Sequence, residues 1–131
     1  MFLSSLKEEE KGFFLKLAYY VARCDNEFLN SEKDIITTYC FEMKIEDNSS
    51  DEEYSLEEIL NKFDSELSKK VVLLEIMALI YFDSKLHDEE QKVLEVMVKK
   101  FDLDRTLIDK YKEWTKSMLT LVSEGKTFFN V

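Results

Sequence analysis

Two short segments of the sequence each carry an aspartate and, seven residues later, a glutamate. They read Asp-Asn-Glu-Phe-Leu-Asn-Ser-Glu and Asp-Ser-Lys-Leu-His-Asp-Glu-Glu, and the acidic ends are Asp25, Glu32, Asp83 and Glu90. Calcium and magnesium are bound in proteins by converging carboxylate and water oxygens. These four residues are therefore the candidate ligands of a divalent cation held between two loops.

A simpler explanation of the same four residues needs no ion. An aspartate just after a helix accepts backbone hydrogen bonds in an Asx-turn. A glutamate in the first turn of the next helix interacts favourably with the positive end of that helix. Both explanations remain open from the sequence, and the local one makes fewer assumptions.

A second acidic stretch has the ligand spacing of an EF-hand loop, with candidates at Asp47, Ser49, Asp51, Glu53 and Glu58. The sharp turn of such a loop requires glycine at its sixth position, which is Glu52 in this sequence. Glu58 also completes a capping box with Ser55, which explains it without a metal. We therefore interpret residues 44–54 as a solvated acidic linker.

The residues that catalysis most often uses are scarce. His87 is the only histidine, so neither the paired histidines of a zinc hydrolase nor the two Glu-x-x-His pairs of a di-iron bundle are present. The sequence shows no obvious activated nucleophile and no glycine-rich phosphate loop. We therefore expect a protein that is not an enzyme.

The hydrophobic pattern predicts that helices position these residues, giving an all-α fold. The chain has no proline and two glycines, and apolar residues recur at helical spacing along most of it. A run that is apolar on all sides indicates a helix surrounded by others. The expected helices span residues 8–24, a segment capped by Asn30 or Ser31, a short segment after Ser55, the central run 71–82, a segment capped by Asp88, and a last one from Asp104 or Thr106 to Gly125.

The sequence repeats itself, because residues 18–43 align without gaps to residues 76–101. Apolar positions coincide almost throughout, and Cys24 and Cys40 fall opposite Phe82 and Val98, so both cysteines are predicted to be reduced core residues. The expected architecture is one domain over residues 1–131. It is a bundle of about six to seven helices with pseudo-symmetric helix-loop-helix halves at 8–43 and 68–101.

Aromatic residues are expected mainly in the core. Tyr19, Tyr20, Tyr81, Phe82 and Trp114 lie in helical stripes, where packing is the common role. The apolar tail 126–131 follows the expected stop at Gly125. We expect this tail to fold back onto the bundle, with anchoring to a partner as the alternative.

The halves resemble the tellurite-resistance TerB-like family. The resemblance rests on a long apolar helix ending in aspartate, a loop with one apolar anchor (Phe28, Leu86), a glutamate opening the next helix, and the phrase Glu-Lys-Gly-Phe-Phe-Leu-Lys-Leu-Ala at residues 10–18. It covers residues 8–122, and a similar domain precedes the J-domain of certain membrane co-chaperones. Asn26 and Ser84 depart from the family, which commonly has glycine there. The resemblance implies an all-helical bundle, an acidic cluster able to take a divalent cation, and involvement in stress-associated assemblies.

The charge balance bears on partners and location. The formal net charge of -10 repels nucleic acid and anionic lipid surfaces, and no apolar run is long enough for membrane insertion. The first ten residues lack the pattern of an export signal, so a cytoplasmic location is expected.

The function expected from these observations is a non-enzymatic, stress-associated module that binds a protein partner through an acidic face. Calcium or magnesium bound by Asp25, Glu32, Asp83 and Glu90 would tune this binding. The alternatives are a metal-dependent hydrolase that uses the same carboxylates in a pocket joining the two loops, and a structural helical oligomer.

Overall fold

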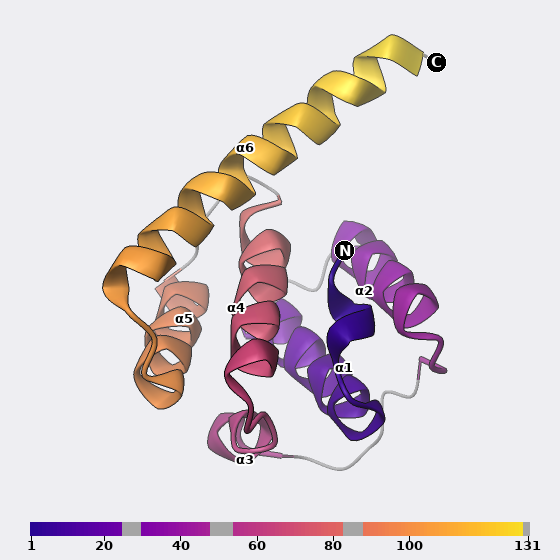
Figure 1. Ribbon diagram of the computed structural model, residues 1–131. Helices are drawn as coiled ribbons and strands as arrows, with labels where there is room; N and C mark the ends of the chain where they lie inside the picture. The colour runs from indigo at the N-terminus through magenta and orange to yellow at the C-terminus, as the bar shows by residue number, and fades with distance from the viewer. Residues whose placement is uncertain (25–29, 48–53, 83–87, 130–131) are drawn as a thin grey trace.

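A computed structural model describes residues 1–24, 30–47, 54–82 and 88–129, and these residues form a bundle of helices without a strand (Figure 1). A single 3-10 turn, η1, precedes six α-helices. Their bounds are η1 Leu3–Ser5, α1 Glu8–Arg23, α2 Asn30–Met43, α3 Leu56–Leu60, α4 Glu66–Tyr81, α5 Asp88–Phe101 and α6 Arg105–Phe129. The all-α prediction is confirmed, and η1 was not predicted.

The two halves have equivalent helix bounds. Helix α1 corresponds to α4 and α2 to α5, and their ends fall at positions that the internal alignment pairs. The starts of α1 and α4, at Glu8 and Glu66, have the same offset but lie before the aligned residues. Both second helices are followed by a residue with a left-handed backbone, Lys44 at φ 58° and Asp102 at φ 51°. Such a residue commonly ends a helix, and it is usually glycine. The halves therefore share the positions at which their helices end.

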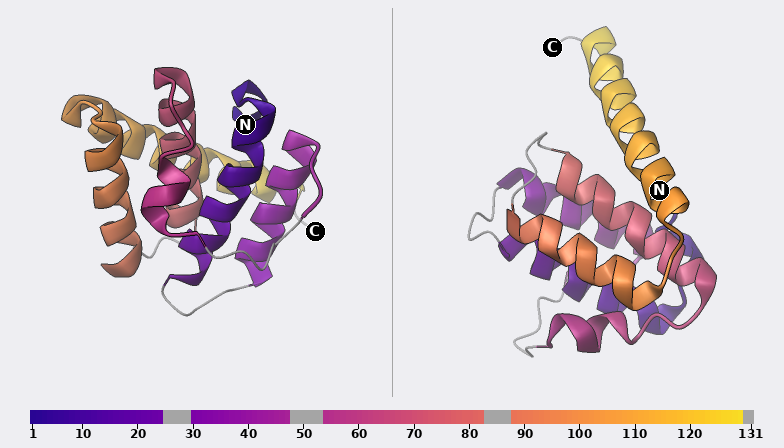
Figure 2. Two further views of the ribbon diagram at one scale, coloured as in Figure 1. Left: turned by 90° about the horizontal axis from the view of Figure 1, so that it is seen from below. Right: turned by 90° about the vertical axis from the view of Figure 1, so that its left-hand side faces the viewer.

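The core lies between α1 and α4, which run through the middle of the molecule. In two views α2 and α5 flank this pair on opposite sides (Figures 1 and 2). Side chains from both halves are fully buried there, including Phe14, Leu17, Ile76 and Met77. The prediction that the apolar run within α4 lies centrally is confirmed.

Local capping signals set several helix starts. Ser55 and Glu58 form the predicted capping box, in which the Glu58 backbone N–H donates to the Ser55 hydroxyl at 3.1 Å. Ser65 caps α4 in a similar way by accepting from the Ser68 backbone N–H at 3.0 Å. A capping side chain satisfies a backbone donor that has no partner inside the helix.

The end of α6 differs from the prediction. The helix continues through Gly125 to Phe129, and Gly125 has no positive φ. The expected stop at Gly125 is therefore wrong, because an uninterrupted helical backbone gives this glycine no left-handed position to fill.

Candidate functional site

Two of the four predicted cation ligands can be placed. Glu32 and Glu90 lie in the first turns of α2 and α5, with only 5% and 4% of their surfaces exposed. These helices lie on opposite flanks of α1 and α4 (Figure 2). Asp25 and Asp83 lie outside the described residues, as do the rest of both loops. The described chain thus places both glutamates at buried helix starts, on different sides of the core.

Two other predicted acidic ligands have hydrogen-bond partners within the protein. Asp47 accepts a hydrogen bond from the Tyr19 hydroxyl at 2.6 Å, and Glu58 accepts from the Ser55 backbone N–H at 3.3 Å. Ser49, Asp51, Glu53 and His87 lie outside the described residues. Within the part of the chain that the structure describes, no three histidine, cysteine or acidic side chains are grouped as a metal centre would need.

Two glutamates that the sequence did not single out hold the N-terminal segment. Glu75 Oε1 accepts from the Met1 ammonium at 2.9 Å and from the Phe2 backbone N–H at 2.8 Å. Glu42 accepts from the Met1 ammonium and the Leu3 backbone N–H, both at 2.8 Å. Burial alone would lower the pKa of the Met1 ammonium, but its hydrogen bonds to both carboxylates raise that pKa above its ordinary value. The position of an acid within the apolar helix α4 is the sequence signal that could have identified Glu75.

Another buried carboxylate, that of Glu10, joins the starts of α1 and α4. Glu10 Oε1 accepts from the Lys7 backbone N–H at 2.9 Å and from the Ser68 hydroxyl at 2.8 Å. The Ser65 hydroxyl in turn donates to Ser68 Oγ at 2.7 Å. Glu10 and Ser68 occupy equivalent positions in the two halves. This short chain of hydrogen bonds therefore links the repeats, and it has a structural role.

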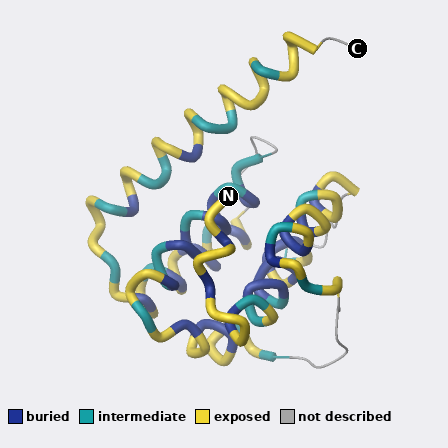
Figure 3. Tube along the Cα trace, turned by 45° about the vertical axis from the view of Figure 1, so that its right-hand side comes forward, coloured by how far each residue is buried: buried dark blue, intermediate teal, exposed yellow. Residues whose placement is uncertain are grey.

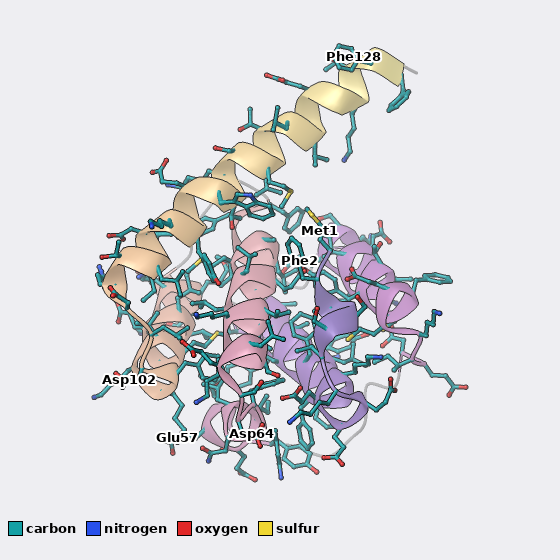
Figure 4. The ribbon with its side chains drawn as sticks, viewed as in Figure 1. Met1, Phe2, Glu57, Asp64, Asp102 and Phe128 are labelled. Atoms are coloured by element: carbon teal, nitrogen blue, oxygen red, sulfur yellow. The ribbon has the colours of Figure 1, made fainter. Side chains whose placement is uncertain are left out.

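Several exposed apolar side chains lie together on the far part of α6. Residues 117–129, here called the α6 arm, extend past the bundle (Figures 1 and 3). Phe128 and Phe129 are 83% and 78% exposed, and Leu121 and Val122 are 65% and 46% exposed. Phe128 projects at the end of the arm, away from the helices (Figure 4). The expectation that this tail folds back onto the bundle is therefore wrong for the described residues.

Two exposed side chains of the arm, Val122 and Phe129, continue the face by which α6 packs on the bundle, and Leu121 and Phe128 lie beside that face. Ile108 and Thr115 are the buried residues of α6, and Val122 and Phe129 follow them at intervals of seven. Residues seven apart lie on nearly the same side of an α-helix. One apolar stripe thus runs the length of α6, and α4 covers its first half only.

Trp114 lies near the point where the covered first half of α6 gives way to its uncovered second half. It is 42% exposed, and its ring centroid lies 6.0 Å from that of Phe2. The prediction of a core role for Trp114 is wrong, and Tyr20 is also partly exposed. Met1 and Phe2 lie below the middle of α6 (Figure 4), so the N-terminal segment adds to the apolar surface beside the arm.

A groove lies along the more polar side of α6. It has a volume of about 830 Å³ and is lined by Tyr81, Phe82, Gln91 and the side of α6 from Lys112 to Thr127. Lys116 Nζ lies 5.7 Å from the centre of the Tyr81 ring, and burial raises the pKa of Tyr81. The described lining combines lysine, glutamate, glutamine and hydroxyl side chains with two aromatic rings.

No family model, curated protein or solved structure matches the chain. The resemblance to TerB-like proteins therefore stays a prediction. None of the described helices has the length and apolar character needed to cross a membrane.

Proposed function

We propose that this protein is a non-enzymatic, protein-binding module that docks through the apolar face of the α6 arm. The observation that carries the proposal is the continuous stripe of α6, which α4 buries over its first half and leaves uncovered over its second. An amphipathic helix with anchors at such spacing commonly binds by laying its apolar face against another protein. Exposed apolar side chains that lie together often mark an interaction site, whereas single exposed apolar residues are common on any protein surface.

The physics of short helices supports the same proposal. Isolated helices shorter than about 12–15 residues are only marginally stable in water. The arm contains Gly125, the β-branched residues Thr120, Val122 and Thr127, and two phenylalanines, all of which have lower helix propensity than alanine. A partner that buries the apolar face would supply the tertiary contacts that the arm lacks.

We also propose that the protein is related to TerB-like proteins and that its docking serves a stress-associated assembly. Calcium or magnesium binding by Asp25, Glu32, Asp83 and Glu90 is a subsidiary proposal, in which an ion would tune the partner's affinity. An acidic docking face, which the sequence suggested, is compatible with the -10 charge. The arm offers the more specific surface because its anchors have a defined spacing.

The docking proposal can be tested by capturing proteins from an extract of the source cells. The bait is the intact chain, the double variant Val122→Asp/Phe129→Asp, or the control Phe41→Asp. Phe41 lies on α2 and is 80% exposed, which matches the 78% exposure of Phe129. We expect a protein captured by the wild type and the control to be lost with the double variant. Equal capture by all three baits would contradict docking through the arm.

A further inference from the structure

We propose that a second copy of this chain covers the α6 arm, so that two arms pair side by side in antiparallel orientation. The inference rests on the proposed function, since it accepts the arm as a docking surface and names its partner. An isologous pair presents the same patch from both copies, so each arm receives the apolar cover that it lacks.

The stripe on α6 has the spacing of a helix-pairing seam. Positions 118, 122, 125 and 129 continue the alternating three- and four-residue steps that begin at Ile108 and Tyr111. This spacing keeps one face of a helix against a partner helix along its whole length. In an antiparallel pair centred between Val122 and Gly125, Met118 of one copy lies opposite Phe129 of the other.

Charge favours contact through the arms over contact through the bundles. The whole chain carries -10, whereas the charged residues of the arm, Glu124 and Lys126, cancel. Antiparallel pairing along about 20 Å of helix leaves the two acidic bundles at opposite ends of the contact. The two bundles are then separated by more than the screening length, which is roughly 8 Å at physiological salt, so the repulsion between them is small.

The exposed area sets the expected strength of the pair. Full burial of an aromatic side chain removes roughly 150–250 Å² from water, so Phe128 and Phe129 offer about 240–400 Å² in each copy at their exposed fractions. With Leu121 and Val122, two copies would bury about 600–1,000 Å² in total. Specific interfaces smaller than about 1,200 Å² are commonly weak and transient. We therefore expect a reversible dimer that dissociates on dilution.

Sedimentation equilibrium of the full chain, over concentrations from about 10 μM to about 1 mM, tests the pairing. The weight-average mass should rise from 15.6 kDa toward twice that value. Val122→Asp and Phe129→Asp should each weaken association by about tenfold or more, while Phe41→Asp should leave it unchanged. Circular dichroism of each variant verifies that the bundle remains folded.

Disulfide trapping tests the orientation in a chain whose Cys24 and Cys40 are replaced by alanine. Val122→Cys lies near the centre of the antiparallel pair and should link two copies on oxidation. Met118→Cys should not link to itself, because the two copies of this residue lie about 16 Å apart along the pair. A parallel pair would link through both cysteines and would overturn the antiparallel arrangement.

A mass of one chain at every concentration would overturn the inference, and so would a dimer that the arm substitutions leave intact. The docking proposal has its own readout, the loss of a captured protein with the arm variant. If the chain is monomeric and the arm variant still loses the captured protein, self-pairing is wrong but docking through the arm stands. If the chain is monomeric and no captured protein is lost, both proposals are wrong.

Discussion

At the scale of single residues, buried carboxylates organise this acidic molecule. Glu75 and Glu42 bind the N-terminal segment, and Glu10 joins the starts of α1 and α4. Carboxylates that accept several donors stabilise a fold because removing them leaves buried N–H groups without partners. The acidic residues of this chain therefore differ widely in their contribution to stability.

Glu75→Gln should lower the free energy of unfolding by about 1–3 kcal/mol, because the amide oxygen accepts more weakly from Phe2 N–H and the Met1 ammonium loses its buried counter-charge. The matched control is Glu66→Gln on the same helix, whose exposed carboxylate pairs with Lys70 at 3.1 Å. It should change stability by no more than about 0.5 kcal/mol. Urea unfolding measures both, and equal effects would contradict the role assigned to Glu75.

Glu32 and Glu90 decide between the local and the cation explanations. Each lies buried in the first turn of a helix, where a carboxylate favours the positive helix end. Glu32→Gln and Glu90→Gln should each lower stability by about 0.5–2 kcal/mol, to the same extent in a chelator and in excess calcium or magnesium. A loss that appears only with the added ion, together with heat of binding that Asp25→Asn/Asp83→Asn abolishes, would favour the cation site instead.

Cys40 should be slow to react with alkylating reagents. Only 5% of its surface is exposed, and burial together with the nearby Asp47 raises the pKa of its thiol. Because the thiolate is the reactive form, we expect alkylation at about pH 8 to be more than about tenfold slower in the folded chain than in urea. Peptide mass spectrometry distinguishes alkylation of Cys40 from alkylation of the half-buried Cys24, which should react first. Fast labelling of Cys40 in the folded chain would contradict this.

At the scale of helices, the arrangement of α4 and α6 explains both the core and the exposed arm. Helix α4 has 16 residues and α6 has 25, so α6 is longer than the helix it packs on. The first half of α6 buries Ile108 and Thr115, and its remaining turns have no such cover. The length difference therefore leaves part of an apolar stripe available for another protein.

Gly125→Ala should stabilise α6. A glycine inside an exposed helix costs about 0.5–1 kcal/mol relative to alanine, and no atom beyond the adjoining stretch of α6 lies within 4 Å of the position a Cβ would take. Circular dichroism at dilutions where the chain is monomeric should show increased helix content. Leu121→Gly, which introduces a glycine one turn earlier, should have the opposite effect. A loss of helix with Gly125→Ala would indicate that α6 ends at Gly125 after all.

At the scale of the whole molecule, the charge of -10 governs how copies approach each other. Like-charged molecules repel through their long-range field, and salt screens that repulsion. Self-association through the neutral arm should therefore strengthen when sodium chloride rises from about 20 mM to about 500 mM. Sedimentation equilibrium at both salt concentrations measures the change. Weaker association at high salt would indicate that ion pairs, rather than the apolar arms, hold the copies together.

The sequence alone determined the helices, most of the core and the capping box at the start of α3. Periodic apolar residues identified α1, α2, α4 and α5, and Ser55 with Glu58 identified the start of α3. These features were predictable because they depend on residues within one or two turns of each other. The internal repeat also placed equivalent helix ends correctly, since both copies carry the same local signals.

Only the tertiary structure decided which apolar residues are covered. Val122 and Phe129 belong to the same stripe as the buried Ile108, yet they remain exposed because α4 does not extend alongside them. Glu75 likewise became a binding residue for the N-terminus through contacts with residues far away in the chain. An amphipathic pattern indicates that a face favours burial, but the relative lengths and placement of the packed helices determine whether anything lies against it.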